Sequence, residues 1–409
     1  MAGPVYILGG TQTDFATNWT RQDQDLFNLF AHTVREALDV CHLDASEVEV
    51  GHVGNFVAEL FAGQGLLGGF FGHADPGFSG MPTSRHEGAC ASGSLAAMAA
   101  MADIESGRYG LACVAGIELM RNVSGQIAAD HLGAAAWRGV EANDATYVWP
   151  AMFSDLAEEY DQRYGLDHQH LMGISKINFD NAKRNPNAQS RAWTFTEESF
   201  QQNDDANPVV EGWMRRHDCG QVTDGAAVIF LASAEKAAAY AAKRGMNLDA
   251  IPRIEGWGHT TAPMRFSQKM TDSQNEDYVL PWTRKAITDA YRRAGISGPR
   301  DLDAIETHDC FSITEYMAIE HFGITAPGEA WKAVEEGTIA ADGALPMNPS
   351  GGLIGLGHPV GATGVRMLLD ASKQVTGTAG DYQVEGAKRV ATYNVGGSGT
   401  TNCSFVVAA

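Results

Sequence analysis

Two cysteines and two histidines lie in short segments that are far apart in the chain and that could serve one reaction. These segments are 86–93 (His-Glu-Gly-Ala-Cys-Ala-Ser-Gly), 308–311 (His-Asp-Cys-Phe), 357–359 (Gly-His-Pro) and 396–399 (Gly-Gly-Ser-Gly). Cys90 offers a nucleophile, Cys310 an acid or base, His358 an activating imidazole, and the turn at Gly396 free backbone N–H groups. A cavity that holds all four could make and break carbon–carbon bonds beside a thioester.

Each of these residues also has a simpler interpretation. A free cysteine is most often a small buried hydrophobic residue, but Cys90 opens a predicted helix of Ala, Gly and Ser, whose N-terminus favours a thiolate. His358 lies in a Gly/Pro turn that fixes its ring, as a base requires. His308 follows a predicted strand directly, at the end where ligands of α/β sheets lie. The same His-Asp-Cys tripeptide recurs at 217–219 in a polar segment, where we expect Cys219 to be structural.

Nucleotide and metal binding are weakly supported by the motifs. The glycines at 351–361 lack the G-x-G-x-x-G spacing and no Walker lysine follows them. The six cysteines form no CxxC pair and show no spacing typical of metal ligands, so we expect no metal site. Reduced thiols in a large Ala/Gly-rich chain are typical of a cytoplasmic protein.

The composition limits the possible partners. The chain has 409 residues, 44% of them hydrophobic, and a formal net charge of -21. It is long enough for more than one domain. The negative charge argues against nucleic acid or an anionic membrane as the main partner, while a local cationic pocket could still bind an anionic small molecule. No run is long enough to span a membrane, and the N-terminus is typical of a first strand, not of a signal peptide.

The elements that must position these residues form two similar series. The first comprises a strand at 4–10, a helix at 26–40, a strand within 48–56, the Cys90 turn and a strand at 111–117. The second comprises a strand from 252, a helix at 282–294, a strand at 302–306, the His358 turn and strands at 389–394 and 401–407. This alternation predicts a mostly parallel, helix-covered sheet in each half. A pseudo-twofold axis would bring the Cys90 and His358 turns together.

A Trp-containing stretch of mixed helices and loops interrupts the first series. We therefore predict three parts: an N-terminal half at 1–121 and 210–250, an inserted loop domain at 122–209 that covers the substrate, and a C-terminal half at 251–409.

The motifs resemble those of the thiolase superfamily, and more narrowly of the sterol-carrier-protein-type thiolases. The matching blocks are C-A-S-G-S at 90–94, H-D-C-F at 308–311, and the run N-P-S-G-G-L to G-H-P to G-A-T-G at 348–364. They occur in the family's order along essentially the whole chain. Ordinary thiolases instead carry N-E-A-F in the middle block and a cysteine where this chain has Asn394. The resemblance implies an α/β fold with duplicated βαβαβαββ halves in a five-layered α-β-α-β-α core.

The resemblance also implies a reaction and its substrates. Cys90, activated by His358, would carry the acyl group in a ping-pong transfer, and Cys310 would take the proton-transfer role of the missing second cysteine. His308 and His358 would stabilise the enolate. Acyl-CoA and CoA would be substrates, with no separate cofactor, and the loop domain would hold CoA through cations that include Lys183 and Arg184.

The same family resemblance implies association with other chains. We expect a homodimer or tetramer, because the strand at 111–117 would otherwise be an exposed apolar edge. Some similar thiolases work with a small zinc-bearing partner of the OB fold.

Two alternatives stay open. One is an acyltransferase or synthase of the same fold with a different acceptor, for which Glu87 alone is a weak acid/base candidate. The other is a non-catalytic acyl-CoA or lipid-binding relative. Release of CoA from acetoacetyl-CoA would distinguish these readings.

Overall fold

The computed structural model describes residues 3–409, so that residues 1–2 of the predicted N-terminal half lie outside the described range. Nine strands form one sheet in the order β3-β2-β4-β7-β1-β8-β11-β10-β9. Their bounds are β1 (Val5–Gln12), β2 (Val50–Gly54), β3 (Thr83–His86), β4 (Leu111–Glu118), β7 (Gly225–Ala232), β8 (Arg253–Thr261), β9 (Ala304–Thr307), β10 (Arg389–Gly396) and β11 (Thr401–Ala408).

The strand order shows the duplication that the sequence predicts. β3-β2-β4-β7-β1 form the first half-sheet, and β9-β10-β11-β8 follow the same order in the second. An isolated bridge from Met347 to Ile305 stands where β3 stands in the first half. Among residues 3–409, the two half-sheets pair at β1 and β8, through Val5–Ile254 and Tyr6–Arg253. The sheet therefore consists of two similar half-sheets.

The sheet is mixed, and our expectation of mostly parallel half-sheets is wrong. Only the pairs β2–β3, β2–β4 and β9–β10 are parallel. β7 runs antiparallel to both β4 and β1, and β11 runs antiparallel to both β10 and β8. The short turn at 397–400 joins β10 directly to β11, and strands joined by so short a turn must be antiparallel.

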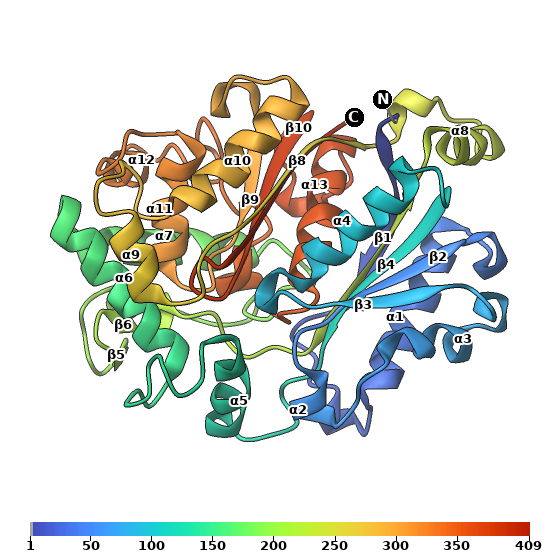
Figure 1. Ribbon diagram of the computed structural model, residues 1–409. Helices are drawn as coiled ribbons and strands as arrows, with labels where there is room; N and C mark the ends of the chain where they lie inside the picture. The colour runs from blue at the N-terminus through green and yellow to red at the C-terminus, as the bar shows by residue number, and fades with distance from the viewer. Residues whose placement is uncertain (1–2) are drawn as a thin grey trace.

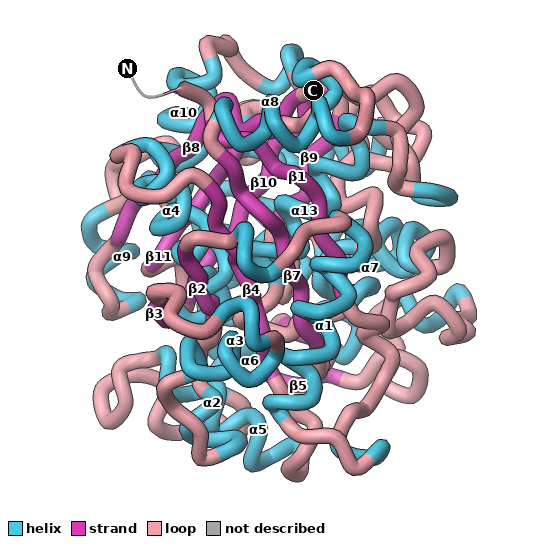
Figure 2. The backbone as a smooth tube through the Cα atoms, turned by 90° about the vertical axis from the view of Figure 1, so that its right-hand side faces the viewer, coloured by secondary structure: helices cyan, strands magenta, loops and turns pink. Residues whose placement is uncertain are grey.

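Helices form the remaining layers of the core. α4 (Ser92–Glu105) and α13 (Thr363–Thr376) contact each other between the half-sheets, within one buried apolar cluster. α1 (Leu26–Cys41) covers the outer face of the first half-sheet, and α10 (Pro281–Ala294) covers that of the second. Figures 1 and 2 show strands in the interior with helices on their outer sides. The result is the expected α-β-α-β-α arrangement.

Further helices and a hairpin complete the fold. They are α2 (Ala58–Ala62), α3 (Phe71–Ala74), α5 (Gly125–Leu132), α6 (Val148–Tyr164), α7 (His168–Ala182), α8 (Ala234–Lys243), α9 (Phe266–Asp272), α11 (Ser312–Phe322), α12 (Ala330–Glu335), β5 (Val209–Glu211) and β6 (Met214–Arg215). α5, α6 and α7, green in Figure 1, belong to the predicted inserted segment 122–209. Among residues 3–409, no helix has both the length and the apolar character needed to cross a membrane.

The edge of the sheet is not where the sequence places it. β4 pairs along its length with β7 and also pairs with β2, so 111–117 is an interior strand and our prediction of an exposed edge there is wrong. Its apolar side chains are buried on both faces. β3 ends the sheet instead, and its residues Thr83 and Ser84 are exposed.

Candidate active site

Cys90 lies in a tight turn that leads into α4. The residue before it, Ala89, has a φ of 52°, a left-handed conformation that costs energy for a residue with a side chain. α4 can approach the His358 turn closely because its first turn carries small residues. A Cβ atom on Gly93 would lie 2.7 Å from the Gly361 oxygen. The Ala/Gly/Ser run therefore brings the two turns together.

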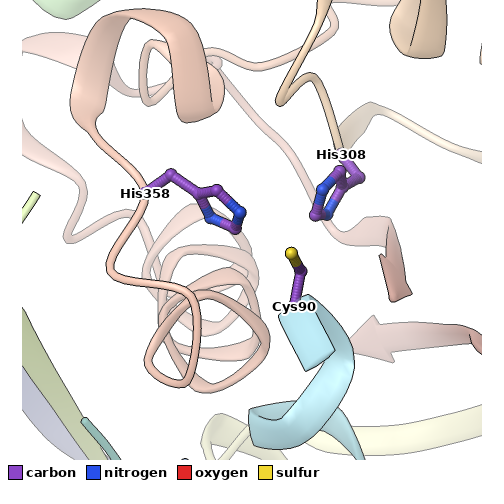
Figure 3. A group of neighbouring side chains, drawn as sticks. All are labelled: Cys90, His308 and His358. Carbon is purple, nitrogen blue, oxygen red and sulfur yellow. The ribbon is translucent and has the colours of Figure 1, made fainter. Parts of the chain in front are cut away.

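The structure brings Cys90, His308 and His358 into one cluster. The Cys90 sulfur and a nitrogen of each ring lie within 4.8 Å of one another. The two rings are nearly perpendicular, with centroids 5.1 Å apart. Figure 3 shows the sulfur between the two rings, with α4 below it. Within residues 3–409, the Nε2 atoms of His308 and His358 have no hydrogen-bond partner, so both are free to act on a substrate.

Hydrogen bonds fix the tautomer of His358. Its Nδ1 lies 2.7 Å from the Thr363 hydroxyl, which donates its own hydrogen to the Pro359 carbonyl at 3.1 Å. With the Thr363 hydroxyl directed at that carbonyl, Nδ1 carries the ring proton and donates it to Thr363. The lone pair of His358 is then on Nε2, beside Cys90. This geometry makes His358 a base.

Asn394 gives His308 the opposite tautomer. Its Nδ2 donates to the Cys90 carbonyl at 3.1 Å and lies 3.0 Å from His308 Nδ1, while its Oδ1 accepts from Ser94 at 2.8 Å. Because a carbonyl can only accept, the amide orientation is determined, and His308 Nδ1 must accept as well. The ring proton of His308 is therefore on Nε2. His308 is therefore a hydrogen-bond donor within the cluster of Cys90 and His358.

Burial keeps the three groups uncharged at rest. Burial raises the pKa of the Cys90 thiol to about 12, with a further increase from Glu118, while the N–H groups of Cys90 and Gly397 oppose the shift. Burial lowers the pKa of His358 to about 3, and it lowers the pKa of His308 well below the ordinary value. Desolvation thus outweighs the helix N-terminus, which favours a thiolate, and Cys90 rests as a thiol.

Cys310 enters the same site from the end of β9. Burial raises the pKa of its thiol well above the ordinary value, and the neighbouring Cys90 and Asp309 raise it further. Asp309 points the other way, where its carboxylate accepts from the Leu353 and Ile354 N–H groups. The tripeptide thus places His308 in the cluster with Cys90, places Cys310 at the cavity, and uses Asp309 to hold the glycine-rich turn that leads to His358.

In the glycine turn, the N–H group that faces Cys90 belongs to Gly397 and not to Gly396. A Cβ atom on Gly396 would overlap the Gly88 carbonyl, so Gly396 permits the close contact between the end of β10 and the Cys90 turn. Gly397 lines the cavity with Cys90, and its N–H faces the sulfur. The oxyanion donor that we predicted at Gly396 is therefore better assigned to Gly397.

A cavity of about 420 Å³ opens in front of Cys90 and Cys310. Its wall is mainly apolar and includes residues of the inserted segment, among them Leu132, Trp149 and Phe153. Cys219, which we expected to be only structural, is buried and also lines this cavity. The lining residues are Phe56, Cys90, Gly125, Gln126, Ala129, Leu132, Ala135, Tyr147, Val148, Trp149, Pro150, Phe153, Val210, Arg216, Cys219, Gly220, Gln221, Val222, Cys310, Phe311, His358, Val360 and Gly397.

The predicted CoA-binding cations lie elsewhere. Lys183, just after α7, pairs with Asp180, and Arg184 donates to the side chain of Asn181; neither lines the cavity. Arg216 is the cation among the lining residues, and its side chain is exposed. Over residues 3–409, Arg216 forms no ion pair.

Comparison with known families decides the classification. The model of the thiolase N-terminal domain matches residues 5–235, and the model of the thiolase C-terminal domain-like family matches residues 265–409. The chain belongs to the thiolase family. The thiolase-type acyltransferase expected from the motifs is thereby confirmed at the level of the family.

Curated relatives cover almost the whole of this thiolase. An acetyl-CoA acetyltransferase of Methanocaldococcus jannaschii is 33% identical over 414 residues and covers 98% of both chains. One of Methanothermobacter thermautotrophicus is 30% identical over 398 residues and covers 97% of both. Human sterol carrier protein 2 is 28% identical, over 96% of this thiolase and 70% of its own length.

Solved structures show the same fold at lower sequence identity. The Ltp2-ChsH2(DUF35) aldolase superposes with a TM-score of 0.77 at 20% identity, over 100% of this thiolase and 98% of that chain. An acetyl-CoA acetyltransferase of Syntrophomonas wolfei superposes with a TM-score of 0.71 at 15% identity, over 100% of both chains.

Two residues of this thiolase's site were not assigned a role from the sequence. Asn394 holds both His308 and the Cys90 carbonyl, although we noted it only as the place of a missing cysteine. Glu118 accepts from the Asn55 side chain and from the N–H groups of Phe56, Val57 and Gly361, and so ties the His358 turn to β4. Burial raises its pKa to about 7. Both Asn394 and Glu118 are polar residues near the end of a buried strand, and this pattern is the sequence signal that could have identified them.

Proposed function

We propose that this thiolase cleaves 3-ketoacyl-CoA with CoA, or condenses acetyl-CoA in the reverse direction. The observation that carries the proposal is the pair of opposite histidine tautomers around Cys90. His358 presents a lone pair to the sulfur, while His308, buried behind Cys90, presents an N–H to the same cluster, and Cys310 lines the cavity in front of it. One base, one donor and a second thiol match the needs of a reaction with a thioester enolate.

The first half-reaction breaks the carbon–carbon bond. His358 Nε2 takes the proton of Cys90 as the sulfur attacks the keto carbon of the substrate. The N–H groups of Cys90 and Gly397 hold the developing oxyanion. The bond between the keto carbon and its neighbour then breaks, and its electron pair forms the enolate of acetyl-CoA, which His308 Nε2–H stabilises. Cys310 gives its proton to the enolate carbon, and the shortened acyl group stays on Cys90.

The second half-reaction returns both protons. The Cys310 thiolate takes the proton of an incoming CoA, whose sulfur attacks the acyl group on Cys90. The Cys90 sulfur leaves and recovers its proton from the imidazolium of His358. Condensation is the same sequence in reverse. Hydrogen bonds carry the charge throughout, so we propose that the reaction uses CoA as a substrate and needs no separate cofactor.

The tautomers also argue against a resident metal in the cluster. Cys90, His308 and His358 are residue types that bind zinc. A ring nitrogen must present its lone pair to a metal, however, and the lone pair of His308 accepts the N–H of Asn394 on the side away from the cluster. Binding would require the Asn394 amide to turn and to leave the Cys90 carbonyl without its donor. We therefore propose a metal-free site.

Association and location follow the family resemblance. We propose a homodimer or tetramer in the cytoplasm. A small zinc-bearing OB-fold partner is also part of the proposal, since the Ltp2-ChsH2(DUF35) aldolase is by its name formed from two proteins. The alternatives of a different acceptor or a non-catalytic binding role are not favoured. Two thiols and two histidines around one cavity are more than a binding protein requires.

The test is CoA-dependent cleavage of acetoacetyl-CoA by the purified chain. We expect thiolysis by the wild type and a loss of about 10²–10⁴-fold in Cys310→Ala, the range of a general acid/base. Acylation of Cys90 should stay detectable in that variant. Cys403→Ala should remain close to wild type, because Cys403 is fully buried in β11, away from the cavity. Normal turnover by Cys310→Ala would contradict the assignment.

A further inference from the structure

A lysine is buried directly behind the glycine turn of the active site. Lys269 belongs to α9, and its side chain is only 4% exposed. Its Nζ donates to the Ser398 carbonyl at 3.0 Å, to the Ser398 hydroxyl at 2.7 Å and to the Thr400 hydroxyl at 2.8 Å. A fourth contact, at 3.1 Å, is to the Met264 carbonyl. Figure 1 shows α9 beside the end of the β10–β11 hairpin where this turn lies.

This arrangement has an energetic cost that packing alone does not explain. All four acceptors are uncharged, so the ammonium group is buried without a carboxylate in contact. Burial lowers the pKa of Lys269 to about 8, with Glu141 opposing the shift, so that the cation persists at neutral pH. A buried charge without a counter-ion is unfavourable unless hydrogen bonds satisfy it. Here the turn from Ser398 to Thr400 provides most of those bonds.

The same turn holds the N–H group that faces the nucleophile. Gly397 comes directly before Ser398 and adopts a φ of 63°. Its N–H faces the Cys90 sulfur and lowers the pKa of the thiol. At the end of the turn, the Thr400 N–H donates to the Gly396 carbonyl, and the Thr400 carbonyl accepts from the Ala262 N–H. The Gly396 carbonyl and the Gly397 N–H belong to one peptide group, which Thr400 holds through that carbonyl. Because Lys269 binds both Ser398 and Thr400, it restricts the orientation of this peptide.

We infer that Lys269 is a positioning residue of the active site, which fixes the 397–400 turn so that the Gly397 N–H remains on the Cys90 sulfur. Lys269 lines no part of the Cys90 cavity and acts through the backbone. The inference rests on the proposed role of Cys90 as the nucleophile. It extends that role by assigning the geometry of the sulfur's hydrogen-bond donor to a side chain on a separate helix.

The test measures alkylation of Cys90 by iodoacetamide as a function of pH, with mass spectrometry of the Cys90 peptide. Lys269→Met keeps the length of the side chain and removes its charge. We expect its alkylation curve to shift to higher pH, with a rate near neutrality about tenfold below wild type, the order expected when a hydrogen bond to a charged group is lost. Lys285→Met, an exposed lysine of α10 paired with Asp289, is the matched control and should leave the curve unchanged.

A purely structural role would give a different result. Lys269→Met would then lose thermal stability while the pH curve of Cys90 stayed at its wild-type position, and this outcome overturns the inference. If Lys269→Met does not fold, Ser398→Ala and Thr400→Val each remove one acceptor. An unchanged curve in both variants overturns the inference equally. Failure of the proposed function would instead appear as missing acylation in the wild type, which the alkylation assay does not measure.

Discussion

Chemistry at the residue scale depends on which ring nitrogen carries a proton. The sequence identified Cys90, His308, Cys310 and His358, because each lies in a short motif whose residue types are typical of a catalytic turn. It named His358 as the activating base, but it did not show which nitrogen of either ring carries the proton. That assignment comes from Thr363 and Asn394, whose hydrogen bonds link segments far apart in the chain. Tautomers depend on three-dimensional contacts, and single motifs do not encode them.

Asn394→Asp should reverse the tautomer of His308. A carboxylate accepts hydrogen bonds only, so it would draw the ring proton to Nδ1 and leave a lone pair on Nε2. The enolate would lose a donor, and we expect kcat for thiolysis of acetoacetyl-CoA to fall by about 10²–10³-fold. Asn122→Asp is the control, because it loses a side-chain hydrogen bond to the Phe61 carbonyl, which lies outside the His308 cluster. Wild-type kcat in Asn394→Asp would disprove the role of the His308 N–H.

At the scale of elements, the main success and the main error of the sequence analysis both come from hydrophobic patterns. Helix and strand positions could be predicted from hydrophobic patterns, and the small residues of α4 correctly indicated close packing at Cys90. Strand direction could not be predicted in the same way, because β7 and β11 are buried on both faces, as parallel strands are, but run antiparallel to their neighbours. The pairing of β4 with both β2 and β7 placed an expected edge in the interior.

The loop elements determine how CoA would be held. The sequence predicted the cations of segment 122–209 for this role, whereas Arg216, the cation that lines the cavity, lies beyond that segment. Arg216→Gln should raise KM for CoA by about tenfold or less with little change in kcat, because an exposed cation contributes on the order of 1 kcal/mol to an anion contact. Lys183→Gln with Arg184→Gln should leave KM unchanged, since neither residue lines the cavity. An unchanged KM for CoA in Arg216→Gln, together with a raised KM in the Lys183→Gln and Arg184→Gln double variant, would contradict this prediction. It would place the CoA contact at the end of α7.

At the scale of the whole molecule, the two half-sheets explain why residues so far apart in sequence share a site. Cys90 precedes α4, and His358 precedes α13; these two helices contact each other between the half-sheets. The duplication was visible in the order of predicted elements. The exact contact was not, because it depends on glycines such as Gly93 and Gly361, whose role is only evident when their backbones meet.

The exposed edge at β3 predicts a dimer. The Gly51 N–H donates to the Pro82 carbonyl, and the Asn55 N–H donates to the His86 carbonyl. The backbone groups of the even-numbered residues of β3 therefore face β2. Thr83 presents its N–H outward. Pairing of this edge with a second copy would cover it. Light scattering should give twice the chain mass of 43.7 kDa. Thr83→Pro, which removes an outward N–H, should weaken the dimer. A monomer at micromolar concentration in the wild type would rule out this prediction.

Covalent labelling of Cys90 tests the central claim most directly. The purified protein is incubated with acetyl-CoA, digested, and its peptides are weighed by mass spectrometry. We predict one added acetyl group on the peptide that contains Cys90, its removal when CoA is added, and no labelling of Cys90→Ala. Acetyl labelling that persists unchanged in Cys90→Ala, or a wild-type protein that cleaves acetoacetyl-CoA without ever acylating Cys90, would contradict the acyl-cysteine mechanism.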